Sequence, residues 1–173
     1  MLNLPVQPRY LLPPLFLMLL SVTFATFDLN DLLEFNRDLV NQGELWRVFS
    51  SQFVHANWAH LALNCGGIIL IWLLHGEYTS PKRYAINISL LALWCGLGVY
   101  WFCPSIYIYT GLSALLHGVI IWGAVKDTTL NGPNADIGKL INSTVAIDAH
   151  LIGAIGGTLL AAPLLVNYIK NKN

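Results

Sequence analysis

Two stretches of this chain contain side chains that could carry out nucleophilic catalysis together. Ser113 lies in "GLSALLHG" (111–118), where His117 follows it one helical turn later. A serine hydroxyl becomes a useful nucleophile when a neighbouring base removes its proton. The second stretch, "DAHLIGAIGG" (148–157), supplies His150. We favour His150 as the base, because a histidine on the serine's own helix has little freedom to serve both the serine and the leaving group.

A third stretch, "HANWAHLALN" (55–64), offers donors for the negative charge that develops in acyl transfer. His60 and Asn64 are four residues apart, so they share one face of a helix. Together with the backbone N–H of Ser113 they are suitable oxyanion donors. His55 precedes them and either supports this cluster or lies at the wet membrane interface, where amphipathic side chains are favoured.

The elements that must position these residues are membrane-spanning helices. The 173-residue chain is 55% hydrophobic and 10% charged, whereas a soluble domain is roughly a quarter charged. A span needs roughly 20 apolar residues. The sequence therefore predicts an all-α polytopic membrane bundle, one domain over 1–173, with five spans. These are 10–27, 59–75, 84–103, the shorter 111–125, and 144–169.

Charge and cysteine usage exclude several classes of function. The formal net charge is zero, and no basic run offers a surface for nucleic acid. The three cysteines have neither a CxxC nor a Cys/His metal spacing, so we expect no metal and no cofactor. The polar residues within the spans cluster at one depth, which disfavours a transporter or channel, since those need a continuous polar path.

The loop charges predict the orientation in the membrane. One set of connections carries the cations, and the positive-inside rule places it in the cytoplasm. These cations are Arg9, Lys82, Arg83, Lys126, Lys170 and Lys172. The acidic loop 28–55 and the uncharged connection 104–110 then lie outside, beside Ser113. His75, at the inner end of the second span, is interpreted as a snorkelling residue.

Glycines predict how the serine helix meets the last helix. Gly153 and Gly157 form a GxxxG on the face of His150, and small residues at this spacing let helices approach closely in lipid. Gly111 and Ala114 flank Ser113 on the other helix. We therefore expect a close crossing that brings Ser113 and His150 within hydrogen-bond reach.

Taken in order, these motifs resemble the signatures of the rhomboid intramembrane serine proteases. The resemblance extends from Gly43 to about Ala162, and its residues are Trp46 and Arg47; His55, His60 and Asn64; Gly111 and Ser113; and His150, Gly153 and Gly157. It implies a serine endopeptidase with a Ser113–His150 dyad that cleaves membrane-anchored proteins within the bilayer. The Trp-Arg pair is either a structural lock of the first loop or an interfacial anchor.

Within that family, "GLSALLHG" with "DAHL" is similar to the rhombosortase branch. That resemblance implies bacterial processing of proteins with a C-terminal Gly-Gly membrane anchor, at the periplasmic side of the inner membrane. It rests mainly on His117, which replaces a tyrosine that many rhomboids carry one turn after the serine. That tyrosine stacks on the catalytic histidine, so the resemblance implies that His117 packs against His150.

One interval departs from the family, whose core has six spans. The fifth helix is missing, because 126–148, "KDTTLNGPNADIGKLINSTVAID", is polar. The interval could cross as a segment shielded by protein. Alternatively, the last helix could insert reversed and separate the dyad, or the sequence could lack a helix through a deletion or a gene-model error. We favour the last of these, and it leaves a catalytically impaired pseudoprotease that binds transmembrane helices as the alternative function.

Overall fold

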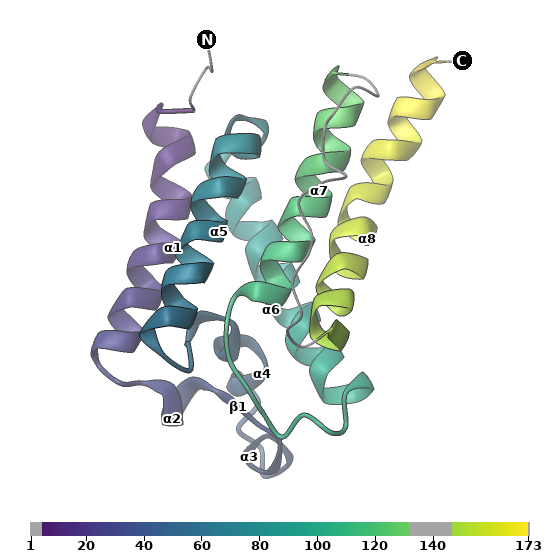
Figure 1. Cartoon of the computed structure of the whole chain (residues 1–173). Coiled ribbons are helices and arrows are strands. Elements are labelled where there is room, and N and C mark those ends of the chain that lie inside the picture. The colour runs from purple at the N-terminus through teal and green to yellow at the C-terminus, as the bar shows by residue number, and fades with distance from the viewer. Residues whose placement is uncertain (1–4, 132–146, 173) are drawn as a thin grey trace.

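In the part of the chain that the structure describes, five long helices stand side by side and form the body of the protein (Figure 1). The structure is a computed structural model that describes residues 5–131 and 147–172. The long helices are α1 (Pro8–Thr26), α5 (Trp58–His75), α6 (Pro81–Phe102), α7 (Ser113–Asn131) and α8 (Ile147–Lys172). The predicted all-α membrane bundle is therefore confirmed.

Four of these helices are long and apolar enough to cross a bilayer, counting the described residues only. They are α1, α5 with the short 3₁₀ turn η2 (Gly76–Tyr78), α6, and α8 over Ile152–Lys170. In α7 the apolar part, Ser113–Lys126, is shorter than a full span. α6 begins three residues before the predicted 84, because Ser80 caps it by accepting a hydrogen bond from the backbone of Arg83.

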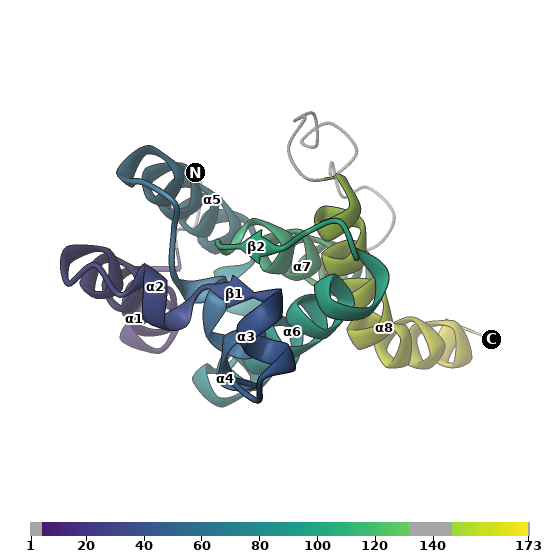
Figure 2. The same ribbon diagram turned by 90° about the horizontal axis from the view of Figure 1, so that it is seen from below.

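The first loop folds into a layer of short elements at one end of the bundle, seen from below in Figure 2. Its elements are α2 (Asn30–Leu33), β1 (Phe35–Asn36), α3 (Arg37–Asn41), α4 (Trp46–Ser50) and the 3₁₀ turn η1 (Ser51–Phe53). β1 pairs antiparallel with β2 (Ile108–Tyr109), and Phe35 lies opposite Tyr109. This pairing joins the first loop to the segment that leads into Ser113.

Arg37 attaches the same loop to the end of α6. Its guanidinium donates to the carbonyl oxygens of Val99 (2.9 Å), Tyr100 (2.8 Å), Cys103 (2.9 Å) and Ile106 (3.1 Å). The last carbonyls of a helix have no partner within the helix, and a cation near them is favourable. Arg37 therefore satisfies the C-terminal end of α6 and fixes the first loop against it.

α8 runs parallel to α7, and both helices rise in the same direction in Figure 1. A Cβ built on Gly153 would lie 1.7 Å from the carbonyl oxygen of Ala114, and one on Gly157 would lie 2.1 Å from that of Gly118. Both contacts advance by four residues along the two helices, which is possible only in a parallel pair. The predicted close crossing is thus present, and the reversed insertion of the last helix is not. The interval 132–146 lies outside the described residues, so the missing helix stays a prediction.

The prediction that His75 snorkels to the interface is wrong. Its side chain is only 7% exposed. A Cβ on Gly123 of α7 would lie 2.5 Å from the Cδ2 atom of His75. Because Gly123 has no side chain, the imidazole packs against α7 instead of extending toward water.

Candidate active site

The segment before Ser113 makes a sharp turn that places the serine at the start of α7. Gly111 has a φ of +111°, a backbone conformation that residues with a Cβ rarely adopt. Its N–H donates to the carbonyl oxygen of Ser51 at 3.0 Å, which ties the turn to the buried η1. Ser113 begins α7 and is half-buried. The turn therefore presents the serine at the loop end of the bundle.

His60 and Asn64 lie directly against this turn. α5 begins at Trp58 because the Asn57 side chain caps it, accepting a hydrogen bond from the backbone N–H of His60 at 2.8 Å. A Cβ on Gly111 would lie 2.6 Å from Cε1 of His60 and 3.5 Å from Nδ2 of Asn64. The two side chains that the sequence placed on one helical face thus meet the turn that carries the serine.

Asn64 holds an unused hydrogen-bond donor beside the turn. The residue is 5% exposed, and its Nδ2 atom is buried with no partner among the described residues. A buried donor without a partner costs free energy, and such groups persist where function requires them. An oxyanion formed next to Gly111 would supply the acceptor.

His55 packs behind His60 in the interior, so the alternative that His55 lies at the wet membrane interface is wrong. It is 2% exposed, and the two imidazole rings meet edge to face with centroids 5.2 Å apart. Neither ring nitrogen of His55 has a hydrogen-bond partner among the residues that the structure describes. Burial, with a smaller contribution from His60, lowers the pKa of His55 from 6.5 to about 4. His55 is therefore neutral at pH 7 and supports the ring of His60 by packing.

This buried histidine predicts a loss of stability in acid. The unfolded chain takes up a proton near pH 6.5, whereas the folded chain resists it until about pH 4. The free energy of unfolding should therefore fall as the pH drops through this window, by at most about 3 kcal/mol for one such group. Unfolding of the purified protein at pH 7, 5.5 and 4.5 measures the slope. His55→Asn should flatten it, and an unchanged slope in that variant would show that another group titrates.

Tyr109 is a site residue that the sequence analysis missed. It is 8% exposed, its hydroxyl donates to the carbonyl oxygen of Gly111 at 3.3 Å, and it also hydrogen-bonds the Ser113 side chain. Burial raises the pKa of this phenol, so it stays protonated at neutral pH. A tyrosine in the apolar-aromatic run "YIY" gives no local signal of this role, which depends on the β1–β2 pairing.

His117 is engaged with the backbone of its own helix. Its Nδ1 donates to the carbonyl oxygen of Ser113 at 2.7 Å. This bond fixes the imidazole alongside the first turn of α7. Because Nδ1 carries the donated proton, this contact concerns the backbone of Ser113 and not its hydroxyl.

α8 begins beside the first turn of α7. Gly153 contacts Ala114, the residue after the serine, and His150 lies one turn before Gly153. The backbone of His150 therefore belongs to the turn of α8 at the serine's end of the bundle, while its side chain lies outside what the structure describes. The indole of Trp94 donates to the carbonyl oxygen of Ile152 at 2.8 Å, which also fixes α8 to α6.

Arg47 and Trp46 have different surroundings. Arg47 is 4% exposed and donates to the Glu44 carboxylate (2.6 Å) and to the carbonyl oxygens of Asp31 (2.9 Å) and Glu34 (3.0 Å). It therefore holds the first loop together from inside. Trp46 is 50% exposed, and its indole donates to a carbonyl oxygen of α2 at 3.2 Å. The arginine matches the structural lock, and the tryptophan keeps a face available to the membrane interface.

This chain is similar to known proteins in the region of the site. The Rhomboid domain family matches residues 42–133, which include each predicted site residue except the three on α8. A protein of Bacillus subtilis (strain 168) named "Putative rhomboid protease YdcA" is 26% identical over 136 residues, covering 70% of this chain and 68% of that protein.

Proposed function

Because this chain belongs to the rhomboid family, we propose that it is an intramembrane serine endopeptidase that cleaves membrane-anchored proteins. The whole chain, 1–173, acts as one domain in this proposal. The observation that carries it is the meeting of three separate segments at Ser113. Gly111 touches His60 and Asn64 of α5, and Ala114 touches Gly153 of α8.

In the proposed mechanism His150 is the general base. It takes the proton of the Ser113 hydroxyl as the oxygen attacks the scissile carbonyl carbon. His60, Asn64 and the backbone N–H of Ser113 hold the oxyanion that forms. His150 then gives the proton to the leaving amine, which departs and leaves an acyl-enzyme. Water adds to the ester carbonyl with His150 again as base, and the carboxylic acid product leaves with Ser113 regenerated.

The substrate must expose a carbonyl near the loop end of the bundle. A transmembrane helix hides its backbone in internal hydrogen bonds, so the cleaved segment has to unwind first. The loop charges favour a periplasmic active site in a bacterial inner membrane, with the cationic connections in the cytoplasm. The finer proposal of rhombosortase-like processing of C-terminal Gly-Gly anchors rests on "GLSALLHG" and "DAHL" alone.

A serine-directed fluorophosphonate tests the proposed nucleophile. We expect the purified protein to be labelled, and Ser113→Ala to abolish the labelling with only a small fall in the unfolding midpoint. The buried Tyr109 hydroxyl loses its bond to Ser113 but keeps the one to the Gly111 carbonyl oxygen. The polar interval 126–148 favours one alternative, a pseudoprotease that binds transmembrane helices without cleaving them. A well-folded sample that binds such helices but takes up no label would support that binder and reject the protease.

Asn64→Ala separates a catalytic donor from a structural one. Loss of one oxyanion donor costs roughly 10²–10³-fold in kcat. Because the Nδ2 atom of Asn64 has no partner among the described residues, its removal should leave the unfolding midpoint nearly unchanged. Cleavage kinetics on a membrane-anchored reporter, with a parallel thermal unfolding scan, measures both. A normal kcat, or a kcat lost together with stability, would contradict the assignment.

A further inference from the structure

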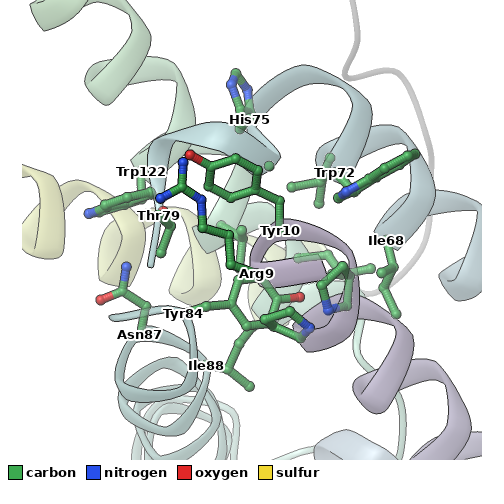
Figure 3. A pocket seen from close by; sticks show the side chains of 16 residues that line it. Arg9, Tyr10, Ile68, Trp72, His75, Thr79, Tyr84, Asn87, Ile88 and Trp122 are labelled. Carbon is green, nitrogen blue, oxygen red and sulfur yellow. The ribbon is translucent and has the colours of Figure 1, made fainter. Parts of the chain in front are cut away.

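A small pocket lies at the end of the bundle opposite Ser113, where four helices converge (Figure 3). The start of α1, the last turns of α5, the first turns of α6 and the middle of α7 line it. Its polar lining includes Arg9, Tyr10, Thr79 and Asn87. The lining is also rich in aromatic side chains, a composition typical of the interface between membrane and water. These are Tyr10, Trp72, Tyr84 and Trp122.

The charge of this pocket has one sign. Arg9 is the one lining residue with a permanent charge, and no carboxylate lines the pocket. The guanidinium of Arg9 is exposed and lies over the Tyr10 ring, 4.6 Å from its centroid. Within the described residues the one ion pair is Arg47–Glu44, so Arg9 has no acidic partner there. Glu77 is near in sequence to the pocket residues of η2 but does not line the pocket. Such a site favours an anion.

The size of the pocket places that anion at its mouth. Its volume is about 30 Å³. One water molecule needs roughly 10–15 Å³ measured in this way, so the interior has room for about two waters and not for a phosphate group. The exposed Arg9 is therefore where a phosphate could be bound.

An apolar groove continues from this pocket along α1 and α6. It has a volume of about 590 Å³, and it shares Pro13, Tyr84 and Ile88 with the pocket. From there it runs past Phe24 to Phe53 in the first-loop layer, and no charged side chain lines it. A cationic mouth continuous with a long apolar groove matches a molecule with an anionic head and a hydrocarbon tail.

We propose that this end of the protein binds one anionic phospholipid, whose phosphate lies against Arg9 and whose acyl chain fills the groove between α1 and α6. Charge selects the head, because Arg9 lacks an acidic partner among the described residues. The groove selects a lipid over a free anion. This binding site is separate from Ser113 and does not depend on the proposed protease activity.

Titration of the full-length protein with phosphatidylglycerol in an uncharged detergent tests this site. We expect the lipid to raise the unfolding midpoint, and phosphatidylcholine with the same acyl chains and inorganic phosphate to raise it much less. Arg9→Gln should weaken the apparent affinity for phosphatidylglycerol about fivefold. The matched control is Arg83→Gln, since Arg83 is exposed at the start of α6 but lines neither the pocket nor the groove. It should bind as the native protein does.

A second variant tests the groove separately, in case Arg9→Gln does not fold. Ala85 is exposed and lines the groove, so Ala85→Trp should fill it and weaken lipid binding while leaving Arg9 in place. Equal stabilisation by phosphatidylcholine, or by inorganic phosphate alone, would overturn the proposal. So would equal losses in Arg9→Gln and Arg83→Gln, or an Ala85→Trp variant that binds phosphatidylglycerol normally.

Discussion

His150→Ala is expected to lower the rate of substrate cleavage by about 10³-fold while the protein stays folded. A general base of this kind contributes roughly 10²–10⁴-fold, and without it the serine hydroxyl keeps its proton. The backbone of His150 lies in the first turn of α8, at the end of the bundle where Ser113 begins α7. Single-turnover cleavage of a membrane-anchored reporter, together with the rate of fluorophosphonate labelling, measures the effect.

His117→Ala is the matched control for that experiment. Both variants remove one imidazole, but His117 is on the serine's helix and its Nδ1 is bound to the Ser113 carbonyl oxygen. We expect a loss of less than about tenfold, since only the support of the first turn is removed. If His117→Ala abolished labelling and His150→Ala did not, the assignment of the base would be wrong.

Gly153→Ala is expected to disrupt the contact between α7 and α8. The added Cβ would lie 1.7 Å from the carbonyl oxygen of Ala114, a backbone atom that cannot move without moving α7. Forcing extra atoms into a close-packed contact typically costs about 1–3 kcal/mol. Displacing α8 by about 1 Å would lower cleavage by roughly 10²-fold. Thermal unfolding and reporter cleavage measure the two losses.

Gly66→Ala makes the same substitution where there is space. Gly66 lies in α5, and a Cβ there would have no atom within 4 Å, neighbouring helical backbone excepted. Alanine is favoured over glycine inside a helix by about 1 kcal/mol, so this variant should be as stable as the native protein or slightly more stable. If both variants lost stability and cleavage to the same extent, the close contact of Gly153 with α7 could not be the cause of these losses.

The positions of the helices along the chain followed from the order of residues. Each apolar segment became a helix, and the spacing of His60 and Asn64 did place both on one face of α5, next to Gly111. The GxxxG spacing of Gly153 and Gly157 predicted the close crossing with α7. These features depend on the spacing and composition of residues along one helix, so they are the same whichever neighbour the helix packs against.

Other features arise only from contacts between distant segments. Arg37 caps α6 from more than sixty residues away, and Tyr109 reaches Ser113 because β2 pairs with β1. His55 lies shortly before α5 and His75 is its last residue, and at either end of a helix a side chain can equally reach water. Both histidines are nevertheless buried. The local sequence does not predict this burial, because it depends on whether a neighbouring helix leaves room for the side chain, as Gly123 of α7 does for His75.

What the sequence by itself determined is therefore the set of helices, the faces they present, and the candidate nucleophile and oxyanion donors. The tertiary structure decided that α8 runs parallel to α7, so that His150 and Ser113 belong to the same end of the bundle. Helix formation depends on neighbours within a few residues. The relative direction of two helices depends on glycines that match their partners' carbonyl oxygens across the interface, and only the packed structure shows which glycine meets which carbonyl.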